Sequence, residues 1–383
     1  MIALLLAALA SPAASTAPPP AVAPADQRAA PLARAVALAD WQLARMNDAA
    51  HVSRATGETR KPRAWEQAVF WVGMTALADA GAPPRIRDAI LAMGRANGWT
   101  PGEKPYFADD HAITQSYLWA AAHGAGPAAR GPATATFDRI VDRPAVTTLA
   151  FAVPPSGYGD TECLTRWCWC DALFMAPPAL AELSRQAGNP KYRDFALREF
   201  WATTDFLLDP VEQLYYRDSR FFERRDAKQR KQFWSRGNGW VFAGMARTIP
   251  LLAKGSADRV RMEALFRAMA AKLKRVQKPD GYWAPSLLAP EGSPPESSGT
   301  TFYTYGMAWG VNAGLLPRAD YAPVARAGWA ALERSIRPDG RLGWVQQVSD
   351  RPESVQADDT QFYGVGGFLL AATQIAALDR VTR

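Results

Sequence analysis

The chain has 383 residues, 48% of them hydrophobic and 21% charged, an ordinary globular composition that is ample for a large core. Its net charge is +7, but the 44 Lys and Arg residues stand singly or in pairs rather than in a cluster. Such a distribution argues against a nucleic-acid-binding protein. A mildly basic surface is better suited to a small acidic substrate.

The chain starts with an apolar run, Met1–Ala10, followed by small residues and a Pro/Ala-rich stretch to about residue 30. The run has the length of the hydrophobic part of an export signal and falls short of the roughly 20 residues that span a bilayer. No other stretch is long and apolar enough for a membrane helix. We therefore expect residues 1–30 to be a signal peptide and leader, and the protein to be periplasmic or secreted.

Apolar residues recur with a period of 3.6 in twelve segments, which Gly- and Pro-rich breakers separate. Every second segment is amphipathic and rich in charge, as in residues 192–199, whereas the others are rich in Gly, Ala and aromatic residues, as in residues 305–310. The expected helices cover residues 28–47, 65–81, 83–98, 109–124, 131–148, 171–188, 190–208, 237–254, 256–278, 301–316, 319–337 and 360–379.

A helix that is apolar on all sides should be buried. Six buried helices that alternate with six exposed ones predict an all-α fold, an (α/α)6 barrel of six helical hairpins. We expect this barrel to be a single catalytic domain over residues 31–383. Parallel inner helices bring their N-termini to one mouth, where free N–H groups and partial positive charge suit a ligand that carries a carboxylate.

The richest of the tracts that open the inner helices is Trp167–Met175, in which Asp171 lies among two indoles, two thiols, a phenyl ring and a thioether. Such surroundings remove hydration, disfavour the charged carboxylate and raise its pKa. A carboxylic acid that stays protonated near neutral pH can donate a proton to a substrate. Asp171 is therefore the leading candidate for the catalytic acid.

Other tracts of aromatic, glycine and polar residues precede the remaining inner helices. Asp and Ser at a helix start are also ordinary N-caps. Capping does not explain the indoles that flank Asp171 and Arg236, so for these two residues we favour a function. Capping is an adequate explanation for Ser298, Asp358, Asp359 and one of the pair Asp109 and Asp110.

Only three cysteines occur, Cys163, Cys168 and Cys170, all within eight positions. Three cysteines cannot form a closed disulfide framework, and the three histidines have no metal-type spacing relative to them. Buried small hydrophobic side chains are therefore the simplest interpretation. A single disulfide from Cys163 to either Cys168 or Cys170 stays open for an exported protein.

In these tracts the sequence resembles the unsaturated uronyl hydrolases, glycoside hydrolase family 105 and its relative family 88, over nearly all of residues 35–380. The family motif Trp-x-Asp-x-x-x-Met corresponds to Trp169–Met175, and Trp-x-Arg-Gly-Asn-Gly-Trp corresponds to Trp234–Trp240. The Ser-Ser-Gly-Thr segment at 297–300 and the Asp-x-Thr-x-x-Tyr-Gly-x-Gly segment at 358–366 also resemble the family. Together these motifs are highly specific.

The resemblance implies a barrel that needs no metal or cofactor and acts on oligosaccharides left by polysaccharide lyases, which end in a uronic acid with a C4–C5 double bond. It also implies that Asp171 protonates C4 as general acid, after which water, activated by the ionised Asp171, attacks C5. Hydration of the double bond, not displacement at C1, then releases the unsaturated sugar. This accounts for one dominant acid in place of the usual pair of carboxylates.

The same resemblance implies the other site residues. The second acid is one of Asp109 and Asp110, and we favour Asp110 as the partner of the attacking water. Arg236 is expected to pair bidentately with the uronate, and Trp234 to stack on a sugar face. The remaining residues that we expect to contact the substrate are Trp169, Met175, Trp240, Asp109, His111 and Arg217.

Two positions depart from the family pattern. Arg217 stands where many members have a histidine; because arginine keeps its proton, any acid–base role is lost there and anion binding is strengthened. Residues 160–162 read Asp-Thr-Glu where members commonly have His or Lys. Unsaturated galacturonyl-rhamnose and a uronyl group on another sugar are therefore both open as substrates.

Two other functions fit the pattern less well. A sugar epimerase on the same barrel works through histidine bases, and only His111 lies in a mouth tract. A non-catalytic periplasmic sugar-binding barrel gives no reason to desolvate an acid among Trp and Cys side chains. We expect an unsaturated uronide as substrate, no cofactor or metal, no nucleic-acid or membrane partner, and a monomer or weak homo-oligomer.

Overall fold

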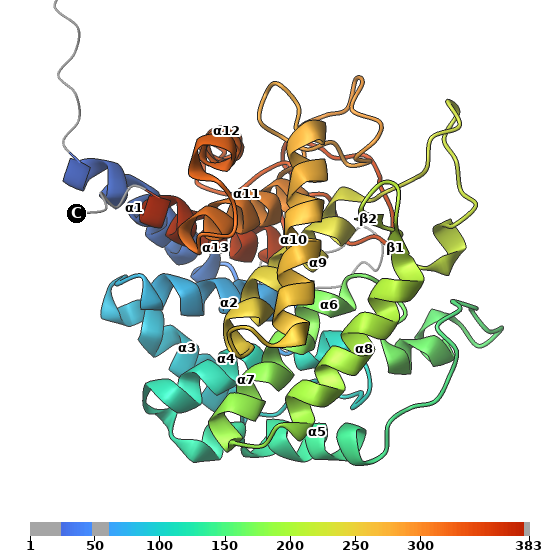
Figure 1. Cartoon of the computed structure of the whole chain (residues 1–383). Helices are drawn as coiled ribbons and strands as arrows, with labels where there is room; N and C mark the ends of the chain where they lie inside the picture. Colours follow the sequence, from blue (N-terminus) through green and yellow to red (C-terminus); the bar gives the residue numbers. More distant parts are fainter. Residues whose placement is uncertain (1–23, 48–60, 379–383) are drawn as a thin grey trace, which may run out of the picture.

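The computed structural model describes residues 24–47 and 61–378, and this part of the chain is mostly helical (Figure 1). A single two-stranded antiparallel sheet, in which Leu208 pairs with Tyr215, is the one sheet among these residues. The elements are α1 (Pro24–Leu43), α2 (Trp65–Asp79), α3 (Pro84–Ala96), α4 (Thr114–Ala120), α5 (Gly131–Asp142), α6 (Ala172–Met175), α7 (Pro177–Ala187), α8 (Lys191–Leu207), β1 (Leu208–Asp209), β2 (Leu214–Tyr215), α9 (Ser235–Thr248), α10 (Ala257–Val276), α11 (Ser297–Asn312), α12 (Arg318–Arg334) and α13 (Phe362–Leu378).

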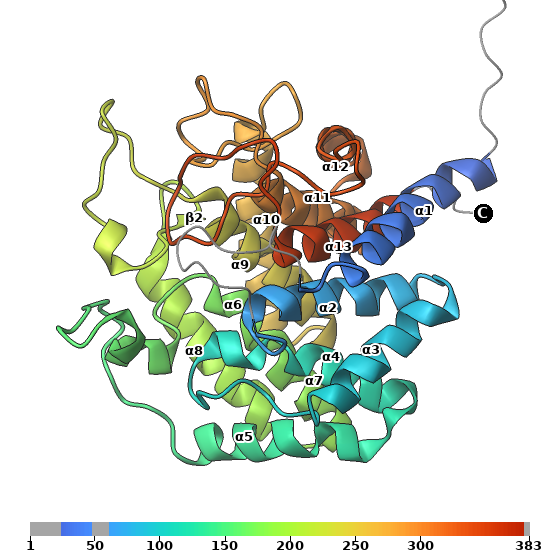
Figure 2. The same cartoon turned by 180° about the vertical axis from the view of Figure 1, so that it is seen from behind.

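The helices form two concentric rings, as Figures 1 and 2 show from opposite sides. In the inner ring α2 contacts α4, α4 contacts α7, the α6–α7 pair contacts α9, α9 contacts α11, α11 contacts α13, and α13 closes the ring on α2. The outer helices α1, α3, α8, α10 and α12 each pack against at least one inner helix, while α5 packs against α8. The fold is therefore the expected (α/α)6 barrel.

Glycine residues let the inner helices approach each other closely. A Cβ atom on Gly366 of α13 would lie 2.2 Å from the carbonyl oxygen of Val69 in α2, and one on Gly73 would lie 2.5 Å from the carbonyl oxygen of Gly366. No side chain fits at such distances, because the interior is already close-packed. The glycines of the charge-poor segments are thus a requirement of the inner ring.

Prolines change the bounds of two expected helices, and the first helix is shifted along the chain. The segment 171–188 is split into α6 and α7 at Pro177, since proline cannot donate an intrahelical hydrogen bond but is favourable in a first helical turn. The segment 131–148 ends at Asp142, two residues before Pro144. The first helix begins at Pro24 rather than 28 and ends at Leu43 rather than 47.

The expected caps also differ. The side chain of Glu296 caps α11, accepting hydrogen bonds from the backbone N–H groups of Ser298 and Gly299 at 2.7 and 2.8 Å. Ser298 therefore lies inside the helix and does not cap it. Asp359 accepts from the N–H of Gln356 at 2.8 Å, so its carboxylate stabilises the turn before α13 rather than the helix start.

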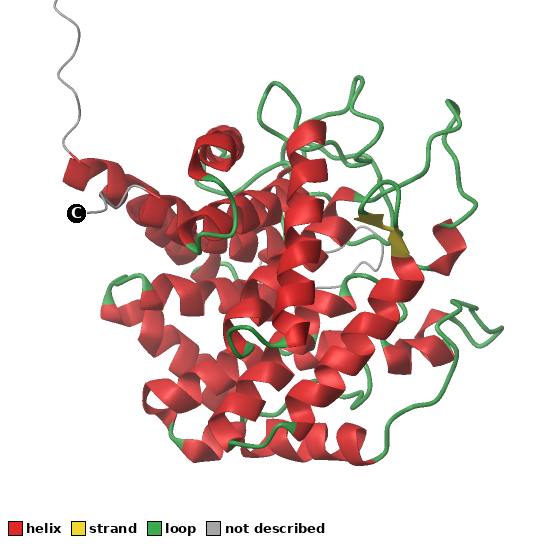
Figure 3. Ribbon diagram, viewed as in Figure 1, coloured by secondary structure: helices red, strands yellow, loops and turns green. Residues whose placement is uncertain are grey.

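The long connections into α6, α9, α11 and α13 gather at one end of the barrel (green in Figure 3). These connections precede inner helices, so the gathering lies at the mouth where the inner helices begin. None of the helices described is long and apolar enough to cross a bilayer. Of the expected signal peptide and leader, residues 1–30, the first 23 residues lie outside the described residues, and residues 24–30 belong to α1. The export signal stays a prediction.

Candidate active site

A cavity of about 530 Å³ opens at this mouth and contains Asp171. Its walls come from the start of α2, the 3-10 turn before α4, the Trp167–Met175 tract, the residues after β2 and the connection into α13. The residues that line it are Trp65, Glu66, Phe107, Asp109, Tyr158, Trp169, Asp171, Met175, Arg217, Val348, Ser349, Asp350, Arg351 and Glu353.

Asp171 stands directly before α6, yet its side chain makes no capping hydrogen bond. The residue is 9% exposed, and its Oδ2 accepts a hydrogen bond from the Cys170 thiol at 3.4 Å. Burial raises the pKa of the Asp171 carboxyl, while the nearby positive charge of Arg217 and the Cys170 hydrogen bond oppose the rise. The N-cap explanation is therefore wrong for Asp171, and its desolvation is as expected.

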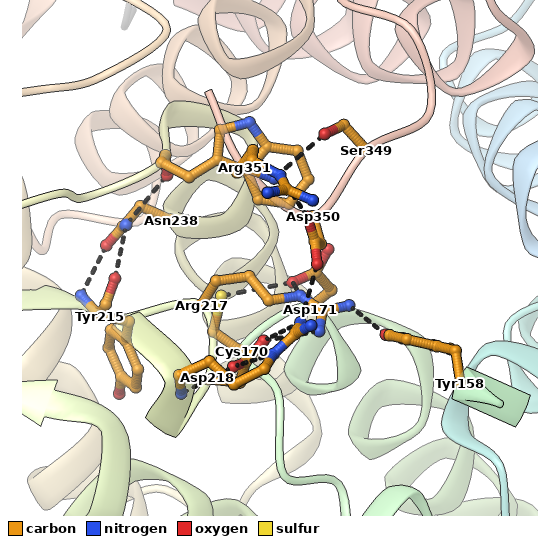
Figure 4. A network of polar contacts seen from close by, with 12 residues as sticks. Tyr158, Cys170, Asp171, Tyr215, Arg217, Asp218, Asn238, Ser349, Asp350 and Arg351 are labelled. Atoms are coloured by element: carbon orange, nitrogen blue, oxygen red, sulfur yellow. Dashed lines mark hydrogen bonds and ion pairs between the residues drawn. The ribbon is translucent and has the colours of Figure 1, made fainter. Parts of the chain in front are cut away.

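Arg217 is the cation that faces Asp171, with 3.7 Å between Nε and Oδ2 (Figure 4). Its Nη1 donates to Asp218 at 2.8 Å, and its Nη2 donates to the hydroxyl of Tyr158 at 2.9 Å. The Nε–H is buried and has no hydrogen-bond partner. A guanidinium has five N–H donors, so Arg217 keeps donors free for a ligand in the cavity.

The position of Arg217 is fixed by one backbone hydrogen bond and by a side-chain amide that holds the strand before it. The N–H of Cys170 donates to the carbonyl of Arg217 at 2.9 Å, which ties the tract of Asp171 to the end of the hairpin. Asn238 in α9 accepts from the N–H of Tyr215 at 2.7 Å and donates to its carbonyl at 2.9 Å (Figure 4). The segment from β2 to Arg217 is thus held by the tract before α6 and by α9.

The neighbouring residues Asp109 and Asp110 face different cavities. Asp109 lines the cavity of Asp171, where burial and the charge of Asp171 raise its pKa well above the ordinary value. Asp110 instead accepts a hydrogen bond from the N–H of Lys104 at 2.5 Å and lines a second cavity of about 330 Å³. The preference for Asp110 as the second acid was therefore wrong in its geometry, and Asp109 is the residue beside Asp171.

Aromatic and thioether groups form one wall of the cavity. The ring of Phe107 stacks on Trp169 with 5.2 Å between centroids and an interplanar angle of 27°. Trp169 and Met175 both line the cavity, as expected, and Trp65 adds a second indole. Such surfaces suit the apolar faces of a sugar ring.

Arg236 does not reach the cavity, and the expected pairing with a uronate is wrong for this structure. The residue is fully buried, and its guanidinium donates to the carbonyl oxygens of Gln346 and Gln347 at 2.8 and 2.9 Å. It lies over the rings of Trp234 and Tyr363 at 4.4 and 4.8 Å. Its donors thus support the segment that leads to Val348 and Ser349 in the cavity wall.

Trp234 and Trp240 are likewise structural rather than exposed to a ligand. The indole N–H of Trp234 donates to Oε1 of Gln346 at 3.0 Å, and the residue is 2% exposed. Trp240 is fully buried against Phe302, with 4.3 Å between ring centroids. Both expectations of substrate contact are corrected, because these rings fill the interior between inner helices.

His111 is also buried away from the cavity. Its Nε2 lies 2.7 Å from the carbonyl oxygen of Pro105, and its ring packs edge-on against Phe137. Burial lowers the pKa of His111 to about 4, so the ring is neutral at ordinary pH. The expected substrate contact is wrong for this residue, and its role is to fix the turn that carries Asp109.

Several lining residues escaped the sequence analysis. Tyr158 contacts Arg217 from a connection that shows no periodic pattern, and the four lining residues Ser349 to Arg351 and Glu353 lie in a similar one. Glu66 and Phe107 lie within two positions of Trp65 and Asp109, where two expected inner helices begin, and this proximity was the available signal. Residues in long connections gave no such signal.

Two of the three cysteines form a disulfide, Cys163–Cys168, and Cys170 is free and buried. The interpretation of all three as reduced core residues was therefore wrong, and the open alternative of one disulfide is realised. Among the described residues no three His, Cys, Asp or Glu side chains come together as a metal site. The bridge closes the turn that leads directly into the tract of Asp171.

Comparison with known proteins identifies relatives along almost the whole chain. The family model of Glycosyl Hydrolase Family 88 matches residues 35–378. An unsaturated 3S-rhamnoglycuronyl hydrolase from Alteromonas sp. (strain LOR) is 37% identical over 344 residues, which are 88% of this chain and 83% of the relative. A protein of the same name from Formosa agariphila is 34% identical over 327 residues, 83% of this chain and 85% of the relative.

A solved structure shows the same fold. A glycosyl hydrolase family 88 protein from Bacteroides vulgatus superposes with a TM-score of 0.78 and 25% identity, covering 92% of this chain and 99% of that chain. These findings confirm the resemblance inferred from the tract motifs.

Proposed function

The chain belongs to glycosyl hydrolase family 88 and is an unsaturated uronyl hydrolase, and on that premise we propose which residues of the cavity carry out the reaction. Asp171 is the general acid and base, Arg217 holds the carboxylate of the uronic acid, and Asp109 is the second acid. The observation that carries this proposal is the burial of Asp171 in the cavity, 3.7 Å from the only buried arginine that lines it among the described residues.

Asp171 supplies the proton that starts the reaction. Its carboxylic acid protonates C4 of the enol ether, and positive charge develops across C5 and the ring oxygen. The ionised Asp171 then takes a proton from the water that attacks C5, so the acid is regenerated. The resulting hemiketal opens at the bond between C5 and the ring oxygen, and the hemiacetal left at C1 releases the second sugar.

Arg217 anchors the substrate beside this acid. A uronate carboxylate can accept two parallel hydrogen bonds from a guanidinium, the strongest geometry for such a pair. The unpaired Nε–H of Arg217 and its remaining Nη–H donors suit this contact. Arg217 also stabilises Asp171 after it has lost its proton, because the two groups are oppositely charged.

Asp109 completes the acid pair. Its pKa is raised by burial and by Asp171, so the two carboxyl groups do not both ionise easily. A protonated Asp109 donates a hydrogen bond within the cavity, and we propose that this bond orients the attacking water. Glu66 also lines the cavity, and its charge contributes to the raised pKa of Asp109.

For the sugar on the other side of the scissile bond we propose a rhamnose. Two relatives that match more than four fifths of this chain are named unsaturated 3S-rhamnoglycuronyl hydrolases. The stacked pair Phe107 and Trp169 offers an apolar surface on which the methyl-bearing face of a deoxy sugar can pack.

We also propose that the protein is exported. The Cys163–Cys168 disulfide supports export to an oxidising compartment, and N-terminal sequencing of the mature protein tests it.

The decisive test follows the ultraviolet absorbance of the conjugated double bond, which hydration removes. We expect loss of absorbance with lyase-generated uronyl-rhamnose disaccharides. Asp171→Asn should lower kcat by about a thousandfold or more, the range expected for loss of a general acid–base group. Full activity of the Asn variant, with an unchanged fold by circular dichroism, would rule out this assignment.

A further inference from the structure

A second cavity borders the catalytic one. Its volume is about 330 Å³, and Phe107 lines both cavities. We propose that this second cavity is a subsite for an oxyanion carried by the part of the substrate beyond the scissile bond, either a sulfate ester or the carboxylate of a further uronic acid. This inference rests on the proposed function, because it assigns the uronyl group to the cavity of Asp171.

The two cavities differ in charge. Five acidic residues line the catalytic cavity, and even when Asp109 and Asp171 are protonated, as the proposed function requires, the other three outnumber its two cations, Arg217 and Arg351. Three cationic residues line the second cavity, against Glu103 and Asp110. An additional anion on the substrate is therefore repelled by the walls around Asp171 and attracted by those across Phe107.

The three cations of the second cavity are Lys61, Arg63 and Lys104, and the two acids neutralise them only in part. Glu103 is shared, with its Oε1 3.5 Å from the Lys61 ammonium and 3.8 Å from the Arg63 guanidinium. Asp110 is occupied by the backbone N–H of Lys104 at 2.5 Å. Burial raises the pKa of Asp110, which further favours its uncharged form. The cavity therefore retains an excess of positive charge.

Two of the cations are held by hydrogen bonds, and one of these two, Lys104, lies at the shared wall. Arg63 is fixed by a hydrogen bond of 2.8 Å from Nη1 to the carbonyl oxygen of Pro101. The Lys104 ammonium lies 5.8 Å from the centre of the Phe107 ring and donates to the carbonyl of Gly159 at 3.2 Å. A charge over Phe107 lies at the border between the two cavities. An anion on the second sugar meets it as the chain leaves the catalytic cavity.

The helix that starts at this cavity adds to the same potential. Ala64, which lines the cavity, is the N-cap of α2 and provides no side-chain acceptor for the first N–H groups. Uncapped N–H groups carry partial positive charge. The adjacency of Asp109 and Asp110 shows how near the cavities are, because neighbouring Cα atoms are about 3.8 Å apart and their side chains face one cavity each.

The test compares matched substrates. Three lyase products are used: an unsaturated disaccharide with a neutral second sugar, the same disaccharide with a sulfate ester on that sugar, and a tetrasaccharide with a second uronic acid. The variants are Lys61→Gln/Arg63→Gln and the single charge reversal Lys61→Glu, whose side chain is 79% exposed and so does not endanger folding. Lys228→Gln is the control, since Lys228 is 65% exposed and pairs with Glu291 far along the chain.

We expect the double variant to raise KM about tenfold for one of the two anionic substrates, as for the loss of two exposed charge contacts, with less than about twofold change for the neutral one. The anionic substrate that responds identifies the source of the oxyanion. The charge reversal should change KM in the same direction, kcat should not change, and Lys228→Gln should behave as wild type. An equal effect on all three substrates, or none on any, would overturn the subsite. A wild-type enzyme that leaves every unsaturated uronide intact would instead refute the proposed function.

Discussion

Two tracts of similar composition open neighbouring inner helices, and they have opposite roles. The tract Trp167–Met175 before and within α6 forms a wall of the cavity, to which Trp169, Asp171 and Met175 contribute. The tract Trp234–Trp240 at the start of α9 contributes no lining residue to that cavity. In the proposed function the first tract contacts the substrate, and the second supports other residues of the cavity wall.

The contacts of the second tract explain how it supports the first. Arg236 donates to the carbonyls of Gln346 and Gln347, which precede the lining residues of the α13 connection. Asn238 holds both backbone polar groups of Tyr215, two residues before Arg217. A motif can therefore be essential to a site without touching its ligand. Variants in which stability and catalysis are measured separately show whether a residue supports the site or contacts the ligand.

The largest expected contrast is between the two buried arginines. Arg217→Gln should lower kcat/KM by about a hundredfold through loss of a charged bidentate contact. Its unfolding free energy should change by less than about 1 kcal/mol, because Asp218 keeps Arg220 as a partner. Arg236→Leu should instead lower the unfolding free energy by about 3 kcal/mol or more, since two buried carbonyls lose a charged donor.

Denaturant unfolding and steady-state kinetics on the two variants give both quantities. An Arg236→Leu protein with wild-type stability and a hundredfold loss of kcat/KM would break the comparison, because it would place Arg236 at the substrate. Leucine is used so that the buried volume stays filled.

A second contrast separates the neighbours Asp109 and Asp110. Asp109→Asn should lower kcat by about a hundredfold, within the range of an acid–base partner. Asp110→Asn should change kcat by less than about threefold, because the amide oxygen can still accept from the N–H of Lys104. The same absorbance assay measures both, and a larger effect at Asp110 would return the second acid to that residue.

The sequence predicted most of the fold because its signals are local. Periodicity and breakers placed the helices, and glycines such as Gly366 marked the inner ring before any contact was known. Asp171, Trp169 and Arg217 were found because they lie in or beside motifs. Local pattern could not decide in which direction a side chain points. Arg236 and Asp110 stand in tracts at the mouth of the barrel, yet their side chains face Gln346 and Lys104.

Sequence patterns did not identify the cavity residues that lie in long connections, for a different reason. Tyr158 and Asp350 have no periodic context, and long-range packing alone brings them to the cavity. The ion pair of 2.8 Å from Arg220 to Asp350 spans 130 positions, and no motif encodes such a contact. The parts of the site that sequence reasoning missed are therefore those set by loop closure.

The pH profile gives a smaller effect with a defined sign. Asp171 must be protonated to donate a proton to C4. Because burial raises the pKa of Asp171 above the ordinary range, kcat should fall as pH rises through this pKa. Arg217→Gln removes the opposing positive charge, so this falling limb should move to higher pH. A shift to lower pH would contradict the proximity of the two groups.

The same titration affects stability. A carboxyl with a raised pKa in the folded state contributes stability below its unfolded pKa, and this contribution is lost as pH rises through the folded pKa. Asp171→Asn should therefore be more stable than wild type at alkaline pH, and this advantage should vanish in acid. Unfolding curves at several pH values measure it, and a constant difference would show that Asp171 does not titrate abnormally.

The smallest expected effect concerns the hydroxyl of Tyr158, which accepts from Nη2 of Arg217 at 2.9 Å. Tyr158→Phe keeps the ring that packs against Phe151 and removes only this hydrogen bond. Since a single hydrogen bond to a charged group is lost while Asp218 still holds Nη1, KM should rise by about threefold to tenfold with kcat nearly unchanged. A fall in kcat without a change in KM would mean that the hydroxyl acts on the reacting atoms and not through Arg217, which would add a residue from a connection to the acid–base machinery of the first tract.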